Sequence, residues 1–553
     1  MAEAPGLAGL MMDVPLTIQS IMRHAERQYA EQEIVSVTCA QARYRYSYGD
    51  AFARARRLAA ALARHGIRPG DRVATLAWND YRHFELYYAI ACMGAVIHTV
   101  NPRLFPQQIA YILNHAGDRL LFVDPLILPL LEALQESLTG VESVIVLADA
   151  EHMPRTSLPN VQCYETFLGG GDAGFEWPAL DEQCACTLCY TSGTTGHPKG
   201  VLYSHRSMVI HSLCSVMPDG FGLSVRDVVM PVVPMFHVNA WGLCYSAPMV
   251  GAKLVLPGPK MGDGAELQAL IEEEQVSFSA GVPTVWLSVL KFLRESGRRI
   301  DSLKNVVIGG SACPWSIMEE MEKHYGVYVR HAWGMTEMSP LGTVTVLKPG
   351  MEDLPPQQLQ ALRSKQGRCL YGVEIKIVDE NNNELPWDGI SAGIIKVRGP
   401  CVCREYYKPD EPDPAHGEDG WFSTGDVGTM DRDGFLQITD RTKDVIKSGG
   451  EWISSIELEN AAVGHPAVAE AAAVAIAHPR WTERPLLVLV RSPGGEVDRD
   501  GMLDYLKDKV PKWWLPDAVV FVDEIPHTAT GKILKSELRK RFADRGRSAC
   551  SDP

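Results

Sequence analysis

The sequence has little that suits a membrane, a secretory route or a nucleic acid. No stretch approaches the roughly 18 uninterrupted apolar residues of a membrane-spanning helix, so we expect no integral membrane segment. The start of the chain lacks the basic and apolar regions of a secretory signal peptide. With 68 acidic against 53 basic residues the formal charge is −15, which argues against broad binding to nucleic acid or to an anionic membrane surface.

The cysteines do not suggest a disulfide framework. Thirteen of them are scattered through apolar runs, and without a secretory signal this favours a reduced, cytoplasmic protein. Cys184, Cys186 and Cys189 have the spacing C-x-C-x-x-C, and Cys401 and Cys403 could complete a zinc site. The first group lies on a predicted strand where small apolar side chains are expected, so packing is the favoured interpretation.

The length and the hydrophobic pattern predict several layers of α/β structure. A chain of 553 residues with 46% apolar residues exceeds one ordinary core, so two to four domains are expected. Short apolar runs alternate with amphipathic ones, as where the helical pattern of 80–94 separates strands at 72–79 and 95–100, and this is typical of parallel sheets covered by helices. Further strands are predicted at 119–124, 141–149, 227–234, 252–258, 276–282 and 303–310.

The pattern changes twice in the last third of the chain. From about residue 366 to 440, short alternating runs predict a small antiparallel, β-barrel-like module, with an Asn-rich hairpin turn inside 373–386 and a strand at 393–400. Strands at 468–479, 484–491 and 517–526 then alternate with helices. We therefore expect an α/β protein with a large N-terminal domain of mostly parallel sheets plus this module (1–440) and a small α+β C-terminal domain (441–553).

One loop carries the strongest chemical signal. Residues 190–200 read YTSGTTGHPKG, in which hydroxyls can hold phosphate oxygens, glycines let backbone N–H groups approach, and a lysine supplies charge. It is not a Walker A loop, because Pro198 stands where the second glycine is needed and Gly200 replaces the Ser or Thr. A solvated linker is the alternative, but the loop follows a predicted strand at 186–190, which favours a polyphosphate site.

This loop resembles the signature of the acyl-adenylate-forming (AMP-binding) superfamily. Four more segments similar to that family follow in order: WGMTEMSP (333–340), WFSTGDVG (421–428), DRTKDVIKSGGEWISSIELE (440–459) and TGKILK (530–535). The resemblance spans nearly the whole chain. The strings at 11–28, 234–243 and 447–455 resemble bacterial medium- and long-chain fatty acyl-CoA synthetases in particular.

The resemblance implies an acid–thiol ligase that uses ATP, Mg²⁺ and coenzyme A. A carboxylate is a poor acyl donor, so in such enzymes it attacks the α-phosphorus of ATP to give acyl-AMP and pyrophosphate, and the CoA thiol then displaces AMP. The first step brings anions together. It therefore requires a metal ion, hydroxyl and amide donors, and a lysine that bridges the two reactants.

The resemblance assigns nucleotide-binding roles residue by residue. Thr191 and Glu337 would hold Mg²⁺, Asp426 would accept hydrogen bonds from the ribose hydroxyls, and Arg441 would lie near the ribose and phosphate. Lys532 would reach the α-phosphate and the carboxylate. The β- and γ-phosphates would be held by Thr191, Ser192, Gly193, Thr194, Thr195 and Lys199, and the adenine side would be formed by Gly309, Gly310, Ser311, Ala312, Trp333, Gly334, Met335 and Thr336.

After adenylation the small domain is expected to be mobile and to rotate about Lys443. This rotation would remove Lys532 and bring the CoA-binding residues Lys447, Gly449, Gly450, Glu451 and Trp452 to line the pantetheine tunnel, where glycines leave room for the narrow cofactor arm.

The acid is expected to be apolar at its far end. Gly334 stands where acetyl-CoA synthetases have a pocket-filling tryptophan, so the pocket floor is expected to be open, and residues 236–251 contain no cation. By resemblance, His237 lies beside the carboxylate and Trp241 gates the acyl tunnel; a buried core aromatic is the alternative for Trp241. The acyl pocket would comprise His237, Val238, Trp241, Gly309 and Gly334.

Other functions remain open at this point. A CoA ligase for an aryl, branched or short functionalised acid carries much the same motifs, and a luciferase-like oxygenase is a remote third possibility. A nucleotide- or acyl-binding protein without catalysis is disfavoured because Thr191, Lys199, Glu337, Asp426, Arg441 and Lys532 are all present. A carrier-protein-loading enzyme is disfavoured because residues 447–455 match CoA-using relatives. Similar fatty acyl-CoA synthetases are often homodimers, so we expect a homodimer.

Overall fold

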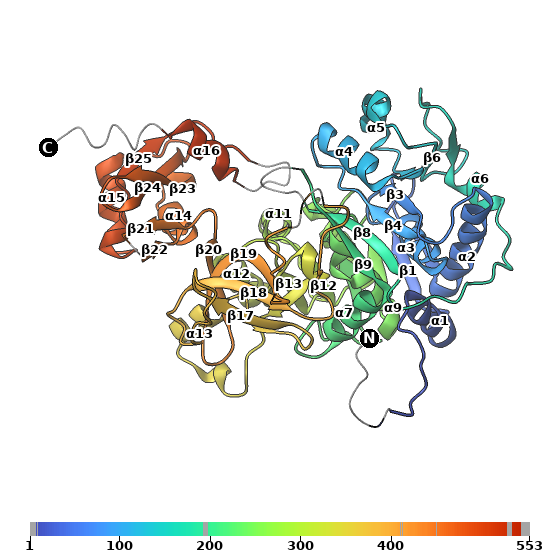
Figure 1. The fold of residues 1–553 in the computed structure, drawn as a ribbon, viewed down its shortest axis with the longest axis horizontal. Coiled ribbons are helices and arrows are strands. Elements are labelled where there is room, and N and C mark those ends of the chain that lie inside the picture. Colours follow the sequence, from blue (N-terminus) through green and yellow to red (C-terminus); the bar gives the residue numbers. More distant parts are fainter. Residues whose placement is uncertain are drawn as a thin grey trace.

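The computed structural model describes residues 7, 9–191, 197–409, 411, 413–417, 419–449, 451–527 and 533–543. Its strands form four sheets (Figure 1). Within these ranges, no helix is both long and apolar enough to cross a bilayer.

The first large sheet has seven strands in the order β7-β6-β5-β3-β4-β8-β9. All neighbours run parallel except the β8–β9 hairpin. Its strands are β3 (Arg72–Leu76), β4 (Val96–Thr99), β5 (Leu120–Val123), β6 (Ser143–Val146), β7 (Val161–Cys163), β8 (Ala185–Tyr190) and β9 (Gly200–Ser204). The helices of this region are α2 (Tyr48–Arg64), α3 (Tyr81–Cys92), α4 (Pro106–Ala116), α5 (Leu128–Leu134), the 3-10 turn η1 (Gln135–Ser137) and α6 (Tyr164–Gly169).

The second large sheet has nine strands in the order β16-β15-β14-β13-β12-β10-β11-β1-β2, with a parallel centre. They are β1 (Glu33–Ser36), β2 (Tyr44–Ser47), β10 (Val228–Pro231), β11 (Lys253–Leu256), β12 (Phe278–Gly281), β13 (Asn305–Ile308), β14 (Tyr328–Gly334), β15 (Leu341–Val344) and β16 (Arg368–Cys369). The helical segments are α1 (Ile18–Gln28), α7 (His205–Val216), α8 (Val238–Trp241), α9 (Leu243–Val250), α10 (Gly264–Glu274), α11 (Pro283–Ser296), α12 (Trp315–Tyr325), η2 (Thr336–Met338), η3 (Met351–Asp353) and α13 (Pro356–Arg363).

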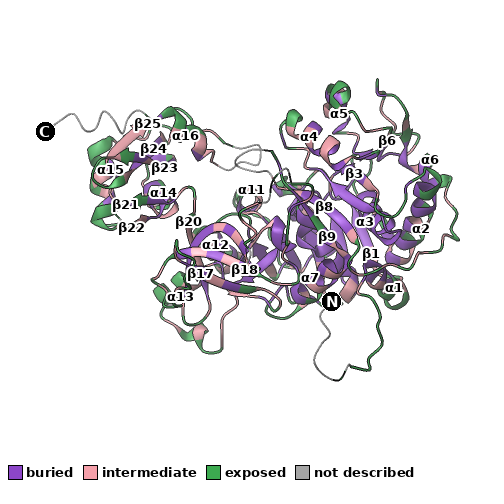
Figure 2. Ribbon diagram, viewed as in Figure 1, coloured by how far each residue is buried: buried purple, intermediate pink, exposed green. Residues whose placement is uncertain are grey.

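Helix α3 connects the two large sheets. Every one of its residues is buried, and it contacts β4 and β8 of the first sheet and β1 of the second. Its N-terminus is capped by Asp80, whose carboxylate accepts a hydrogen bond from the backbone N–H of His83 at 2.8 Å. Its polar side chains are paired, Glu85 with Arg54 and Arg82 with Glu165, which allows the whole helix to be buried. Figure 2 shows the burial concentrated in this helix and the strands beside it.

The predicted antiparallel module is a four-stranded sheet in the order β17-β18-β19-β20. Its strands are β17 (Glu374–Val378), β18 (Gly393–Arg398), β19 (Phe422–Met430) and β20 (Leu436–Arg441). The Asn-rich turn predicted after β17 is present, because one carboxylate oxygen of Asp379 accepts hydrogen bonds from the backbone N–H groups of Asn381 and Asn383, each at 2.8 Å.

The chain enters a different sheet between Arg441 and Ile446, next to the predicted domain boundary. This sheet and its helices lie at one end of the molecule in Figure 1. Its strands are β21 (Ile446–Ser448), β22 (Glu451–Ile453), β23 (Val468–His478), β24 (Thr482–Arg491) and β25 (Ala518–Phe521). The helices are α14 (Ser455–Val463), α15 (Arg499–Leu506), the 3-10 turn η4 (Lys512–Trp514) and α16 (Lys535–Arg541).

Buried polar contacts join β20 to the C-terminal helices. The carboxylate of Asp440 accepts hydrogen bonds from the backbone N–H and the hydroxyl of Ser455 at 2.5 and 2.9 Å. Lys535 donates to the same hydroxyl at 2.6 Å and forms an ion pair with Glu459 at 2.7 Å. Burial raises the pKa of Glu459 to about 7, and the positive charge of Lys535 opposes that rise. These contacts fix the base of α14 and α16 against β20.

Candidate active site

Three of the candidate segments follow parallel strands of the nine-stranded sheet. Residues 234–241 follow β10, residues 309–312 follow β13, and residues 334–337 end and follow β14. Because β10, β12, β13 and β14 run parallel, their carboxyl ends lie at one edge, which is where open α/β sheets bind ligands.

The phosphate-loop candidate joins β8 to β9. The backbone N–H of Thr191 donates to the carbonyl of Lys199 at 2.9 Å, which closes the two ends of the loop. Ser192, Gly193, Thr194 and Thr195 lie outside the described residues. The Lys199 ammonium forms an ion pair with Asp413 and lies 5.0 Å from the ring centroid of Tyr406. A phosphate at this lysine therefore competes with a carboxylate already in place.

Glu337 is a buried carboxylate with one polar partner from the chain segment after β18. It is 6% exposed, and the hydroxyl of Tyr406 donates to its Oε1 at 2.7 Å. Burial raises the pKa of Glu337, whereas the Tyr406 hydrogen bond and the positive charge of Arg441 lower it. A buried carboxylate of this kind is stabilised in its charged form by a cation placed beside it.

Asp426 connects two more of the predicted residues. Its carboxylate accepts a hydrogen bond from the indole N–H of Trp333 at 3.0 Å and forms an ion pair with Arg441 at 2.7 Å. Asp426 and Arg441 are cross-strand partners on β19 and β20. A ribose placed at Asp426 would share this carboxylate with the indole, so Trp333 contributes a hydrogen-bond donor in addition to the flat ring expected from the sequence.

The other residues predicted to surround the adenine differ in burial: some are exposed, and others are buried or half-buried. Gly310, Ser311 and Ala312 are exposed at the end of β13, and Gly310 has a φ of +80°. The carbonyl of buried Thr336 accepts a hydrogen bond from Tyr203 at 2.6 Å. Met335 is half-buried and packs against the main core.

Gly334 has a packing requirement that the sequence did not reveal. A Cβ at this position would lie 2.2 Å from the carbonyl oxygen of Pro340, a distance that real side chains do not adopt. This close approach of two backbone segments explains the glycine by itself, whereas the sequence suggested that it opens the floor of an acyl pocket. A tryptophan here would require residues 334–340 to move.

The acyl-pocket candidates after β10 lie on a left-handed turn. Val238, Asn239, Ala240 and Trp241 have φ values of +48°, +56°, +51° and +56°, a conformation that costs roughly 1–2 kcal/mol per non-glycine residue. The Trp241 ring lies against Gly309, because a Cβ there would be 3.2 Å from its Cη2 atom. Val238 and Trp241 are buried, whereas His237 is exposed.

The CoA-binding candidates lie at the edge of the C-terminal sheet. Lys447 forms an ion pair with Glu380 at 2.5 Å, and its Nζ lies 5.8 Å from the ring centroid of Trp452. A Cβ on Gly449 would be 2.8 Å from the ring of Trp481. Gly450 and the side chain of Glu451 lie outside what the structure describes.

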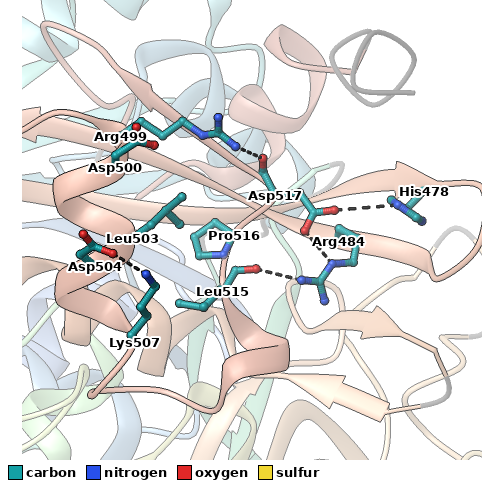
Figure 3. A pocket seen from close by; sticks show the side chains of 10 residues that line it. All are labelled: His478, Arg484, Arg499, Asp500, Leu503, Asp504, Lys507, Leu515, Pro516 and Asp517. Carbon is teal, nitrogen blue, oxygen red and sulfur yellow. Dashed lines mark hydrogen bonds and ion pairs between the residues drawn. The ribbon is translucent and has the colours of Figure 1, made fainter. Parts of the chain in front are cut away.

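Gly449 borders a cavity of about 400 Å³ that is also lined by Ser448, Trp481, Arg484, Trp513 and Asp517. Arg484 and Asp517, paired at 2.8 Å, also line a second cavity of about 680 Å³. Figure 3 shows that this second cavity has several charged side chains, among them Arg499 and Lys507. The carboxylates of Asp500, Asp504 and Asp517 also line it, as many as its arginines and lysine, so its charge does not by itself select an anion. The tryptophans of the smaller cavity suit a ligand with a flat ring.

The predicted hinge is held by the last helix of the structure. The carbonyl of Lys443 accepts a hydrogen bond from Arg539 at 3.2 Å, and Arg539 also pairs with Asp444 at 2.7 Å. Lys532 lies outside the described residues.

Sequence reasoning missed several residues that the structure places at the site. Tyr406 and Asp413 contact Glu337 and Lys199, but the segment that contains them has no recognisable motif. Trp481 borders the CoA candidates from a strand-to-strand turn. For Tyr406 and Trp481 the available signal was an aromatic residue near a charged motif, which many surface aromatics share. Asp413 carried no signal in the sequence. The C-x-C-x-x-C cysteines carry free thiols, and among the described residues no group of three or more His, Cys, Asp or Glu side chains is placed to hold a metal ion.

Comparison with known proteins identifies the class. The family described as AMP-binding enzyme matches residues 22–407, and its C-terminal domain matches residues 457–532. The chain therefore belongs to the AMP-binding enzyme family, and it is an acid–thiol ligase of that family.

Three relatives are similar over almost the full length. A medium-chain-fatty-acid–CoA ligase of Ectopseudomonas oleovorans is 49% identical over 97% of this chain and 98% of its own. A 3-methylmercaptopropionyl-CoA ligase of Ruegeria lacuscaerulensis is 49% identical over 97% and 99%. A long-chain-fatty-acid–CoA ligase of Thermus thermophilus is 46% identical over 96% of both chains.

The fold matches solved structures of more distant proteins. An anthranilate CoA ligase in complex with anthranoyl-AMP superimposes with a TM-score of 0.82 at 23% identity, covering 97% of this chain and 99% of that one. An o-succinylbenzoate CoA synthetase of Bacillus subtilis has a TM-score of 0.78 at 24% identity over 96% and 99%.

The side chains present could supply only some of the ligands of a Mg²⁺ ion. Mg²⁺ takes oxygen ligands and usually keeps waters and substrate phosphates in its shell. The Glu337 carboxylate, with one oxygen bonded to Tyr406, suits a site in which one carboxylate and the Thr191 hydroxyl are the protein's share.

We expect Tyr406→Phe to shift the pH dependence of Mg·ATP binding. The substitution removes a hydrogen bond that lowers the pKa of Glu337 and keeps the ring beside Lys199. The pKa of Glu337 should therefore rise, and as the pH is lowered the affinity for Mg·ATP should be lost at a higher pH than in the unmodified protein. Calorimetric titration with Mg·ATP between pH 5 and 9 measures this.

Tyr407→Phe is the matched control, because the Tyr407 hydroxyl contacts only the carbonyl of Ala116, at 3.5 Å, among the contacts described. The assignment of Glu337 as the titrating metal ligand is wrong if both variants follow the wild-type pH curve.

Proposed function

We propose that this acid–thiol ligase activates a medium- or long-chain fatty acid with ATP and transfers it to coenzyme A. One observation carries the proposal: two polar clusters meet at the ends of parallel strands. The first consists of Lys199, Tyr406 and Glu337, and the second of Trp333, Asp426 and Arg441. Trp333 and Glu337 lie at the end of β14. Beside them, Trp241 against Gly309 forms an apolar wall. Polyphosphate, ribose and an apolar tail each find suitable chemistry in adjacent segments.

The first step is attack of the acid carboxylate on the α-phosphorus of ATP, with pyrophosphate leaving. Lys199 and the N–H groups of its loop hold the terminal phosphates, and Asp426 orients the ribose. Arg441, beside Asp426, lies near the phosphate, and Lys532 places a positive charge between the two anionic reactants. Glu337 and Thr191 would hold Mg²⁺, whose charge would neutralise that of the phosphates.

The second step is attack of the CoA sulfur on the acyl carbonyl. The carbon–sulfur bond forms, the bond between the acyl carbon and the AMP oxygen breaks, and the thiol proton passes to solvent. Rotation of residues 441–553 about Lys443 exchanges Lys532 for the face formed by Lys447, Gly449, Gly450, Glu451 and Trp452. One chain thereby serves two reactions that need different groups at the same carbonyl.

The proposal also specifies the class of carboxylic acid that is activated. The names of the Ectopseudomonas and Thermus relatives support a medium- or long-chain acid, and the absence of cations in 236–251 supports an apolar tail. A short functionalised acid is the alternative, favoured by the equally similar 3-methylmercaptopropionyl-CoA ligase. The buried position of Trp241 beside Gly309 favours contact with a chain long enough to reach it.

The decisive test is release of pyrophosphate from ATP and Mg²⁺ with acids of increasing chain length, plus aryl, branched and thioether acids, with and without CoA. We expect a maximum at medium or long chains and a fall of about a thousandfold in Lys532→Ala, since one charge that acts in the transition state is lost. Lys540→Ala, which removes an exposed cation eight residues further along the chain, controls for the loss of a positive charge. A maximum at a short functionalised acid would overturn the chain-length proposal, and ATP binding without release for any acid would leave a binding protein.

We propose further that the tryptophan-lined cavity beside Gly449 receives part of CoA. Trp481→Ala should raise KM for CoA by about tenfold through loss of stacking, with pyrophosphate release in the absence of CoA unchanged. The comparison variant is Trp387→Ala, an equally exposed tryptophan on the β17–β18 connection. Equal CoA dependence in both variants would place CoA elsewhere.

We also propose a cytoplasmic homodimer. Free thiols suit a reducing compartment, and Leu10, Met11, Met12 and Val14 are exposed by 90%, 88%, 92% and 63%, more apolar surface than an isolated segment usually presents. Light scattering should give twice 60.9 kDa, and replacing the first three with serine should shift the mass toward the monomer. A monomer mass for the unmodified chain would contradict the proposal.

A further inference from the structure

The left-handed turn after β10 is an unusual element in a chain of L-amino acids. Four consecutive non-glycine residues, Val238 to Trp241, have positive φ, and Gly242 continues the run at +80°. Isolated residues visit this region, but a full turn in it persists only where the surroundings hold it. The element lies where Trp241 faces the residues that follow β13, Gly309 and Gly310.

Asn239 is the residue of the turn that is tied most closely to the rest of the fold. It is fully buried, and its side-chain oxygen accepts a hydrogen bond from the Tyr87 hydroxyl at 3.2 Å. The same oxygen lies 3.9 Å from the Cys189 thiol, and the side-chain nitrogen lies 3.8 Å from the Met208 sulfur. Asparagine also tolerates the left-handed region better than other non-glycine residues.

These partners come from three different elements. Tyr87 belongs to the buried helix α3, Met208 to α7, and Cys189 to β8, two residues before Thr191. The single proton of the Tyr87 hydroxyl is shared between the Asn239 side-chain oxygen and the carbonyl of Met235, which lies closer, at 2.5 Å. One amide therefore attaches the acyl-side turn both to the central helix and to the strand that enters the phosphate loop.

The other side of the turn is closely packed. A Cβ at position 242 would lie 2.8 Å from Nδ1 of buried His211, and one at position 309 would lie 3.2 Å from the Trp241 ring. The turn is thus confined by contacts at Gly242 and Trp241, and its centre is held by the Asn239 amide.

We propose that Asn239 is a positioning residue that fixes the left-handed turn and so sets the preference of the enzyme for acids whose tails reach Trp241. This inference rests on the proposed function and deepens it. Without the amide, the turn relaxes toward ordinary φ values and Trp241 leaves its contact with Gly309. Long acids lose an apolar wall, whereas acids too short to reach it are activated as before.

The test is steady-state pyrophosphate release by Asn239→Ala and Asn239→Gly with a series from butyrate to palmitate. Glycine keeps the left-handed backbone accessible but has no amide, so it separates the two contributions. We expect both variants to raise KM for the longest acids that the unmodified enzyme uses by about tenfold. KM for ATP and kcat with butyrate should stay within about twofold. Tyr87→Phe should change the profile in the same direction to a smaller extent.

The matched control is Asn160→Ala, since Asn160 is also a left-handed asparagine (φ +53°) but lies on the surface. The inference is overturned if Asn239→Gly keeps the wild-type chain-length profile, or if kcat falls equally for all acids with KM unchanged. If none of the acids supports pyrophosphate release by the unmodified enzyme, the proposed function itself fails. An active wild type with unaltered variant profiles refutes only the role of Asn239.

Discussion

The carboxyl ends of parallel strands must lie at the same edge of a sheet, and this constraint organises the whole site. Residues 234–241, 309–312 and 334–337 are far apart in the sequence, but each follows a strand of one parallel array. The β8–β9 hairpin adds a loop from the other large sheet, whose strand β8 packs against the shared helix α3. Position in the site is therefore set by strand order, and the polar side chains are additions to a rigid apolar frame.

Buried polar groups at this edge are held in pairs or triads. Asp426 has both Trp333 and Arg441, Glu337 has Tyr406, and Asp440 has Ser455. A buried carboxylate without partners is strongly disfavoured, so each of these groups links two elements. Asp426 and Arg441 come from the antiparallel module, which explains why that module is needed beside the parallel sheets. The polar network also extends through Lys535 to the C-terminal helices.

The sequence predicted much of the fold because hydrophobic periodicity and turn chemistry are local. The strands at 72–79 and 303–310, the helix at 80–94 and the Asn-rich turn after β17 all follow from such patterns. The segments that resemble a known family supplied the candidate residues. The chemistry of the loop at 190–200 could be inferred because phosphate-binding loops use few residue types. Tyr406, Asp413 and Asn239 could not be predicted, since their roles depend on long-range contacts that no local pattern encodes. The reason for Gly334 was also hidden, although Pro340 belongs to the same motif, because only the folded backbone brings the Pro340 carbonyl against Gly334.

The pairing of Lys199 with Asp413 has a consequence for which anions can be retained. The Lys199 ammonium already has a carboxylate beside it, so an anion must replace Asp413 to bind there. A singly charged anion gains little electrostatic energy by doing so, whereas a polyphosphate carries more negative charge and gains more. If Lys199 holds a terminal phosphate as proposed, binding would separate it from Asp413, and the ion pair would form again when the polyphosphate leaves. The Lys199 side chain is 45% exposed, so water weakens this ion pair and separating it would cost little.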